Sequence, residues 1–386
     1  MKSFDEATLT LADIFKFSPL LGKLSKDKHK VIQDIKNCRT IVLGGHAIRC
    51  KDCSFIKSCY NSCRNRHCPS CQYLARVKWI EAREKDLLPC PYFHVVFTIP
   101  ADLRSLILIN KSISYDILFK TASQTIKKVA KTHHGIDIGC IGILHTWAQN
   151  LIDHPHIHFL VPSGGLNEEK TKWVKGTEKY FLPVEALADT FRGKILDYFE
   201  KAFYQGKLKF IGKISYLSHP ANFKELLLVC SQKKFNIEIR KPFAGPSQVL
   251  KYLGQYTHRI AISNYRLLKI EDGKVFFKVR DNDNPGRSKI MSLTLKEFMR
   301  RFLLHVLPRG YVRIRHFGLL GNRYKKITIA LIHKIQNIKV VLKANVEESW
   351  QEVVKRVTGI DVYVCPRCKS RSLTIVKPIK SMINSS

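Results

Sequence analysis

Long apolar runs are missing from this 386-residue sequence, and no stretch reaches the roughly eighteen apolar residues that a membrane-spanning helix needs. The first residues lack the apolar core of a signal peptide, and no lipidation motif is present. Internal repeats and long low-complexity linkers are also missing. These absences argue against a membrane protein, an exported protein or a repeat array. We therefore expect a globular cytoplasmic protein in a reducing environment.

Acidic residues are scarce relative to basic ones. The chain has 31 Asp and Glu residues against 66 Lys and Arg residues, a formal net charge of +35, and the basic excess is spread along the sequence. Such a field favours a polyanionic partner. Because membrane signals are missing, nucleic acid is the better match. The hydrophobic content of 45% is enough for a buried core, and the length fits about two or three domains.

Six of the twelve cysteines are concentrated in residues 50–71, in a pattern typical of zinc sites. Cys50 and Cys53 form one CxxC pair, and Cys68 and Cys71 form a second pair after a short interval. This spacing predicts four thiolates around one tetrahedral Zn²⁺ with a structural role. Further candidate ligands leave open a second Zn²⁺ or other choices at the first site: Cys63, His67, Cys59 and His46.

The other cysteines carry weaker signals. Cys365 and Cys368 form a CxxC pair with no partner pair after it, so a zinc site and an unliganded turn are equally good interpretations. Four isolated cysteines are best explained as packing residues: Cys38, Cys90, Cys140 and Cys230.

Hydrophobic periodicity predicts a mixture of helices and strands, and therefore an α+β fold. Residues up to about 37 and the region beyond residue 280 look largely helical, the latter with a strongly basic composition. Between them, strands are expected at 93–99, 138–147, the segment around residue 156, and 274–280, and helices at 112–131, 184–205 and 223–233.

Two histidines in one of these strands are candidate metal ligands. His156 and His158 are separated by one apolar residue, so they point to the same face of a strand and can share a cation. Taken alone, such a pair is more often structural. Gln149 can supply a third, oxygen ligand, and His145 and His154 compete for that position. This donor set suits Mg²⁺ or Mn²⁺, which would polarise and orient a scissile phosphate.

Two tyrosines lie about ninety residues further on. Tyr252 and Tyr256 are four residues apart in a helix-like stretch and share one face, where they are either core aromatics or paired nucleophiles. A phenol near pKa 10 needs help to lose its proton, and either the metal or His258 could provide that help. Lys251 and Arg259 are weaker candidates for phosphate contacts.

These motifs occur in a characteristic order. The cysteine block ends in CRNRHCPSC, and HPHIH, YLGQYTHR and RIRHFG follow along the chain. With this order, the chain from about residue 10 to about residue 335 resembles the rolling-circle transposases of bacterial insertion sequences, which carry two catalytic tyrosines. These enzymes are relatives of Helitron transposases and phage replication initiators.

The resemblance implies an HUH endonuclease fold. In that fold a central antiparallel sheet flanked by helices carries the histidine pair on a middle strand, with the tyrosine helix beside it and a small cysteine-rich zinc-binding domain before it. By similarity, His156 and His158 bind a divalent cation, with Gln149 at the third-ligand position. Tyr252 and Tyr256 would attack single-stranded DNA at the element's ends and in the target.

The implied products are a 5′-phosphotyrosine link and a free 3′-hydroxyl, without any nucleotide cofactor. One departure is that related initiators often carry lysine immediately before the second tyrosine, where this chain has Gln255. Phosphate contacts must then come from elsewhere, with Lys251 and Arg259 as candidates.

Five parts are expected along the chain: a helical segment at 1–40, the zinc-binding domain at 41–90, the tyrosine nuclease core at 91–265, a basic part at 266–345, and a CxxC-containing tail at 346–386. Two other functions fit parts of the sequence. His154, His156 and His158 also look like the motif of histidine-triad nucleotide hydrolases, but those proteins have neither the zinc block nor the tyrosine pair. A non-catalytic, zinc-dependent DNA-binding protein is the second alternative.

Overall fold

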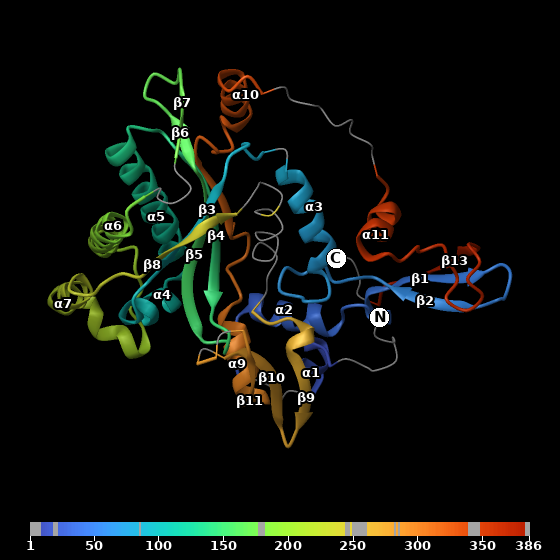
Figure 1. Ribbon diagram of the computed structural model, residues 1–386. Helices are drawn as coiled ribbons and strands as arrows, with labels where there is room; N and C mark the ends of the chain where they lie inside the picture. The colour runs from blue at the N-terminus through green and yellow to red at the C-terminus, as the bar shows by residue number, and fades with distance from the viewer. Residues whose placement is uncertain are drawn as a thin grey trace. The chain divides into compact units, whose positions relative to one another are not determined.

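A computed structural model (Figure 1) describes residues 9–17, 22–84, 86–176, 182–243, 248, 261–281, 283–284, 286–338 and 348–382. The chain forms two compact units, each built from segments that are distant in sequence. Unit 1 comprises Met1–Val77, His258–Arg300 and Val341–Ser386, and unit 2 comprises Lys78–Thr257 and Arg301–Val340. The unit boundaries fall inside α3 (Gln72–Glu84) and α9 (Leu295–Leu304).

Unit 2 is built around an antiparallel sheet. Among the described residues, five strands form it in the order β12-β4-β5-β3-β8. Their bounds are β3 Tyr92–Thr98, β4 Gly139–Trp147, β5 Asp153–Pro162, β8 Ile237–Phe243 and β12 Ile314–Gly318. Every neighbouring pair is antiparallel. The strand that carries His156 and His158 is therefore the middle strand of the sheet.

One face of this sheet forms the main hydrophobic core. Strand alternation sends Phe97 of β3, together with Ile157 and Phe159 of β5, to the same face, where all three are fully buried. Helices α5 (Lys111–His134) and α6 (Val184–Tyr204) cover this face, with α4 (Arg104–Ile109) and α7 (Pro220–Ser231) nearby (Figure 1). Burial of each such side chain stabilises the fold by about 1.5–3 kcal/mol.

The opposite face carries the histidines beside a smaller core. Ile143 lies directly across from His158, and Leu160 follows two residues later on the same face. These apolar residues pack with Ile329 and Ile332 of α10 (Lys325–Ile335). A separate ribbon of two short strands, β6 (Gly164–Leu166) and β7 (Trp173–Lys175), follows β5. Polar and apolar side chains thus share the face on which the site is built.

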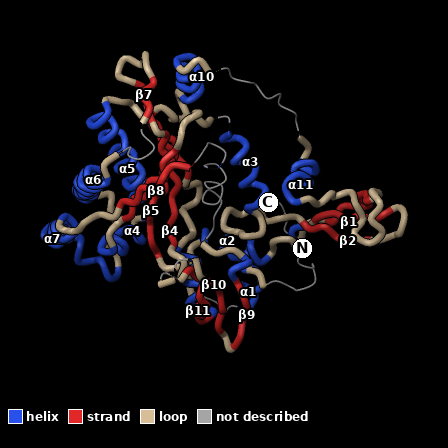
Figure 2. Tube along the Cα trace, in the orientation of Figure 1, coloured by secondary structure: helices blue, strands red, loops and turns tan. Residues whose placement is uncertain are grey.

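Unit 1 contains two small antiparallel sheets (Figure 2). One has the order β13-β1-β2, with β1 Gly45–Cys50, β2 Ile56–Tyr60 and β13 Leu373–Ile379. The other has the order β11-β10-β9, with β9 Leu267–Glu271, β10 Lys274–Arg280 and β11 Ser288–Thr294. Besides parts of α3 and α9, its described α-helices are α1 (Leu11–Phe17), α2 (Lys26–Lys36) and α11 (Trp350–Thr358), the last of which starts with a Ser349–Glu352 capping box. Strand β13 brings the C-terminal segment into a sheet with the N-terminal one.

The predicted mixed fold with a central antiparallel sheet is confirmed. The helices and strands expected between residues 93 and 233, and the strand at 274–280, are all present within a few residues of the predicted bounds. The prediction of a largely helical region beyond residue 280 is wrong, because the strands β11, β12 and β13 lie there. The two units also cut across the five consecutive parts, since distant strands pair with one another and local periodicity does not reveal such pairing.

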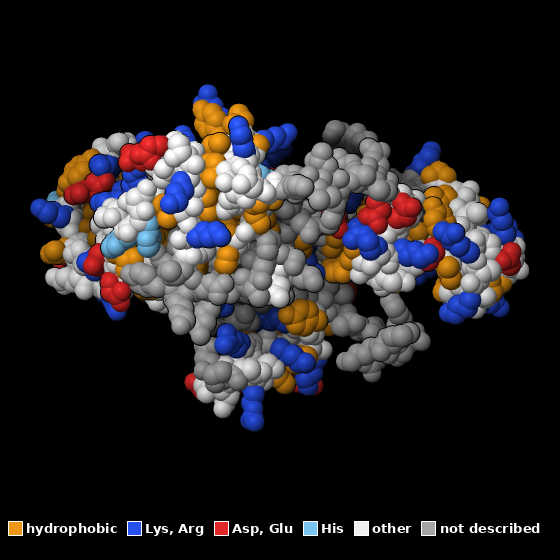
Figure 3. All heavy atoms as spheres, turned by 45° about the horizontal axis from the view of Figure 1, so that its top comes forward, with side chains coloured by type: hydrophobic (Ala, Val, Ile, Leu, Met, Phe, Trp, Pro, Cys, Tyr) orange, Lys and Arg blue, Asp and Glu red, His pale blue; other side chains and the backbone are white. Residues whose placement is uncertain are grey.

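Within the described ranges, no helix is both long enough and apolar enough to cross a membrane. Lys and Arg side chains are scattered over the visible surfaces of the structure, with Asp and Glu interspersed among them (Figure 3). The excess of positive charge is therefore dispersed and is not confined to a tail.

Candidate active site and metal centres

Three histidines come together on the second face of the central sheet. His145 on β4 lies directly across from His156 on β5, and His158 is two residues further along β5 on the same face. Their ligand nitrogens all lie within 4.8 Å of one another. His145 and His158 are buried, whereas His156 is partly exposed. The strand register thus assembles three imidazoles with one of them open toward solvent.

Hydrogen bonds orient two of these rings. The Nδ1 of His156 lies 2.6 Å from the carbonyl oxygen of His154, so Nδ1–H must donate and the Nε2 lone pair is available for a cation. The Nδ1 of His158 lies 2.7 Å from Nε2 of His94, a fully buried residue of β3. Metal-binding histidines commonly hold their other ring nitrogen in this way.

Burial keeps His156, His158 and His94 neutral near pH 7. It lowers the pKa of His156 to about 4, and it lowers the pKa of His158 well below the usual histidine value. Burial also lowers the pKa of His94 to about 4. A neutral imidazole is the form that binds a metal, so the donor set fits a divalent cation.

The structure brings one of the competing third ligands, His145, together with His156 and His158, whereas the sequence favoured Gln149. Gln149 is an exposed residue in the turn after β4, while His145, its competitor for that position, completes the cluster of described residues. His154, the other competitor, is not part of this cluster. Strand β5 carries one extra residue here, because His145 pairs with His156 and Trp147 pairs with Asp153. This bulge also accommodates Pro155, which has no N–H to donate.

The predicted nucleophiles fall in a part of the chain that the structure does not describe. Tyr252 and Tyr256 lie outside the described residues, as do Lys251, His258 and Arg259. Their roles remain predictions from the sequence motif.

The cysteines form two four-sulfur clusters. Cys38, Cys63, Cys68 and Cys71 make the first, with Sγ–Sγ distances of 3.4 Å between Cys38 and Cys71 and 3.6 Å between Cys63 and Cys71. Four thiolates around one Zn²⁺, with bonds of about 2.3 Å, lie about 3.8 Å apart, so this cluster fits the ion. Cys38 follows α2 and was expected to be a packing residue; its isolated position in the sequence gave no ligand signal.

The second cluster contains Cys50, Cys53, Cys365 and Cys368. The prediction that Cys50, Cys53, Cys68 and Cys71 share one zinc is therefore wrong: each CxxC pair belongs to a different cluster, because β1 carries Cys50 away from the turn that holds Cys68. Within the described ranges, three other candidate ligands belong to neither cluster: His46 and Cys59, which face each other across β1 and β2, and His67.

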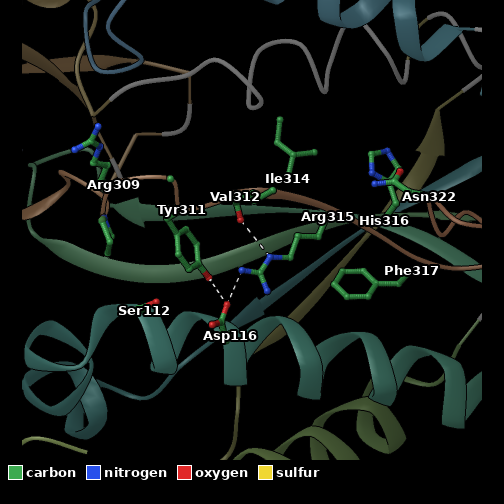
Figure 4. A pocket seen from close by; sticks show the side chains of 12 residues that line it. Ser112, Asp116, Arg309, Tyr311, Val312, Ile314, Arg315, His316, Phe317 and Asn322 are labelled. Carbon is green, nitrogen blue, oxygen red and sulfur yellow. Dashed lines mark hydrogen bonds and ion pairs between the residues drawn. The ribbon is translucent and has the colours of Figure 1, made fainter. Parts of the chain in front are cut away.

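A pocket of about 560 Å³ lies beside the RIRHFG motif (Figure 4). Arg315 from β12 ion-pairs with Asp116 of α5 at 2.5 Å, and the Tyr311 hydroxyl donates to the same carboxylate at 3.1 Å. The guanidinium also stacks 4.6 Å over the ring of Phe119. Arg315 thus connects β12 to α5. Because its charge is already paired with Asp116, Arg315 is a poor candidate for binding phosphate.

Comparison with known proteins identifies the family. A family model described as "Putative transposase" matches residues 139–327, and one described as "Transposase zinc-binding domain" matches residues 11–99. A "Putative transposase y4qJ" of Sinorhizobium fredii is 39% identical over 376 residues, covering 95% of this chain and 94% of that protein. The chain belongs to the insertion-sequence transposase family. The "Transposase for insertion sequence element IS801" of Pseudomonas savastanoi pv. phaseolicola is 28% identical over 305 residues, with 78% and 72% coverage.

The matches agree with the geometry. The transposase match contains the three histidines, and the zinc-binding match contains the first cysteine cluster. The transposase thus acts in DNA transposition, has DNA as its partner and carries a zinc-binding domain with a structural role for Zn²⁺. Cys365 and Cys368 lie outside both matched ranges.

Proposed function

We propose that the transposase cuts and rejoins single-stranded DNA at the ends of its mobile element and in target DNA, through a covalent tyrosine intermediate. The observation that carries this proposal is the cluster of His145, His156 and His158 on the central strands of an antiparallel sheet, with ligand nitrogens within 4.8 Å of one another. A divalent cation bound there would polarise the scissile phosphate and fix its orientation.

The protein residues that hold the cation are the three imidazoles, with His145 in the position first assigned to Gln149. His94 acts as a positioning residue, since its ring nitrogen fixes the orientation of His158 at 2.7 Å. Three nitrogen ligands favour a transition metal over Mg²⁺, which prefers oxygen ligands. Of the two ions expected from the sequence, Mn²⁺ is therefore the better match.

Tyr252 and Tyr256 are the proposed nucleophiles. A phenol oxygen attacks the scissile phosphorus, the bond from phosphorus to the 3′ oxygen breaks, and the phenol proton ends on the released 3′-hydroxyl. The downstream strand remains attached to the tyrosine through its 5′-phosphate. Rejoining reverses these steps, so the energy of the phosphodiester bond is conserved and no nucleotide cofactor is required. Two tyrosines permit successive cleavage of donor and target.

Basic and titratable neighbours support the same assignment. Lys251 and Arg259 flank the tyrosines in sequence and would neutralise charge on the phosphate as it reacts. His258 lies two residues after Tyr256 and is a candidate acceptor of a phenol proton.

The proposal is tested with labelled single-stranded oligonucleotides that tile the ends of the element encoding the protein. Purified full-length protein is incubated with Mn²⁺ or Mg²⁺, and covalent adducts are resolved by denaturing electrophoresis. We expect an adduct that requires metal, is lost in Tyr252→Phe/Tyr256→Phe and is lost in His156→Ala/His158→Ala. Tight DNA binding without an adduct under any ion would favour the non-catalytic DNA-binding protein, and an adduct that survives the double Phe substitution would overturn the choice of nucleophiles.

A further inference from the structure

We propose that Cys50, Cys53, Cys365 and Cys368 bind a second structural Zn²⁺, which fastens the C-terminal segment of the chain to the zinc-binding domain. The four Sγ atoms lie within 4.8 Å of one another. Cys50 and Cys368 are 3.5 Å apart, and Cys53 and Cys365 are 3.6 Å apart. These separations are close to the roughly 3.8 Å expected for four thiolates around zinc, and far longer than a disulfide bond of about 2.05 Å.

Both CxxC pairs adopt the same backbone turn. The N–H of Cys50 donates to the carbonyl of Phe55 at 2.8 Å, and the N–H of Cys365 donates to the carbonyl of Ser370, five residues on, also at 2.8 Å. The fourth residue after the first cysteine has positive φ in each case, at 56° for Ser54 and 65° for Lys369. Two matching tight turns that present paired thiols to a common point are the arrangement expected of a pair of zinc knuckles.

Neighbouring hydroxyls lie against the sulfurs of the cluster. Ser370 Oγ lies 3.0 Å from Sγ of Cys368 and 3.5 Å from Sγ of Cys50. Ser372 lies 2.6 Å from Ser370 and donates in turn to Asp52. Polar neighbours of this kind commonly hold metal ligands in a fixed orientation.

The surrounding hydrophobic core is small. Cys50 and Cys365 are fully buried and Leu373 is largely buried beside them, and only Ile48, Cys53 and Phe55 pack against them as partly buried neighbours among the described residues. A core of this size contributes little on its own, so metal binding would supply much of the folding free energy of this module. The ion would also hold β13 in register on β1, where Leu373 pairs with Cys50.

The site therefore spans most of the chain. Cys53 and Cys365 are 312 residues apart, and the C-terminal pair lies beyond the zinc-binding match, which ends at residue 99. One cluster is contributed entirely by the N-terminal segment, whereas the other is complete only when the C-terminal segment is present.

The test is the zinc content of full-length protein, measured by atomic emission after gel filtration. Compared with the wild type, Cys365→Ser/Cys368→Ser should lose one equivalent of zinc per chain. The matched control, Cys90→Ser/Cys230→Ser, should lose none, because neither residue is in a cluster of the described residues. Because the zinc content of each variant is compared with that of the wild type, any zinc bound at the histidine cluster contributes equally to both and does not affect the difference.

A second variant covers the case in which the serine protein misfolds and loses all its zinc. Cys368→His keeps a tetrahedral set of three thiolates and one imidazole, so it should retain the wild-type zinc content. When loaded with Co²⁺, it should show a shifted visible spectrum, since one sulfur ligand is replaced by nitrogen. Unchanged zinc in the serine variant, or loss of zinc in Cys368→His, would overturn the proposal.

Discussion

Among single residues, His94 has a role that the sequence alone does not indicate, which is to orient the metal-binding ring of His158. It is a fully buried histidine within the apolar strand β3, and its ring nitrogen lies 2.7 Å from that of His158. We expect His94→Ala to raise the Mn²⁺ concentration for half-maximal adduct formation by about 10- to 100-fold, because the orientation of His158 is lost. The adduct yield at saturating Mn²⁺ should change much less.

A purely structural role for His94 would give a different pattern, with reduced yield at every Mn²⁺ concentration and an unchanged midpoint. His94→Gln is the matched control, since an amide can also hydrogen-bond to the His158 nitrogen and should recover part of the shift.

The identity of the third ligand gives a second prediction. His145→Ala should raise the Mn²⁺ requirement by at least about 10-fold, because it removes one of three nitrogen donors. Gln149→Ala should leave the requirement nearly unchanged, since Gln149 is an exposed turn residue. Metal titrations of adduct formation compare the two variants directly, and the reverse ranking would restore Gln149 as the ligand.

These residues show how far the sequence reaches. The alternation of a strand is enough to place His156 and His158 on one face. It cannot select His145, because that choice depends on the register between β4 and β5, which includes a bulge. Cys38 was missed for a similar reason, since only the fold brings it to the Cys68–Cys71 turn.

At the scale of elements, the packing of α5 on the sheet depends on a glycine. A Cβ at Gly142 of β4 would lie 2.7 Å from the Phe159 ring and 3.1 Å from the Phe119 ring, so the absence of a side chain makes room for both aromatics. We expect Gly142→Ala to lower the free energy of unfolding by about 1–3 kcal/mol, as overpacking of a core does.

Gly193→Ala is the matched control for that substitution. Gly193 is exposed within α6, and a Cβ added there would meet nothing within 4 Å, so alanine should raise the free energy of unfolding by about 0.5–1 kcal/mol. Urea denaturation measures both changes. If Gly142→Ala left the free energy of unfolding unchanged or raised it, the β4–α5 contact would be looser than the structure indicates.

Individual elements were the most predictable part of the fold, and their pairing was the least predictable. The strands at β3, β4 and β10 and the helices at α5 and α6 follow from periodicity, because long apolar patterns dominate locally. Strand β12 was hidden in a basic stretch, and it is recognisable only through its pairing with β4 across about 170 residues of intervening chain.

At the scale of the whole molecule, unit 1 depends on both ends of the chain. Deleting residues 348–386 removes β13, so β1 loses one of its two partner strands and Cys50 and Cys53 lose the other half of their cluster. We expect two thiols of the truncated protein, Cys50 and Cys53, to react rapidly with a thiol reagent under native conditions, whereas they are protected in the full-length protein. Mass mapping of the labelled cysteines identifies them.

The first cysteine cluster serves as the internal control in that experiment. Cys38, Cys63, Cys68 and Cys71 draw no ligand from the C-terminal segment, so they should remain protected in the truncated protein. Equal protection of Cys50 and Cys53 before and after truncation would contradict the interlocking of the two ends. Local sequence patterns could not have shown this dependence, because the Cys365–Cys368 pair has no partner within its own neighbourhood.

The distance between the two halves of the second cluster also sets an order of events during synthesis. Cys53 leaves the ribosome 312 residues before Cys365. At about 5–20 residues per second, translation of that interval takes roughly 15–60 s. During that time Cys50 and Cys53 have no C-terminal cysteines to complete their cluster, and a chain that ends before Cys365 never completes it. Completion of this module therefore requires that translation has passed β13, and a product that stops before Cys365 would enter the cell with an open strand edge and two reactive thiols.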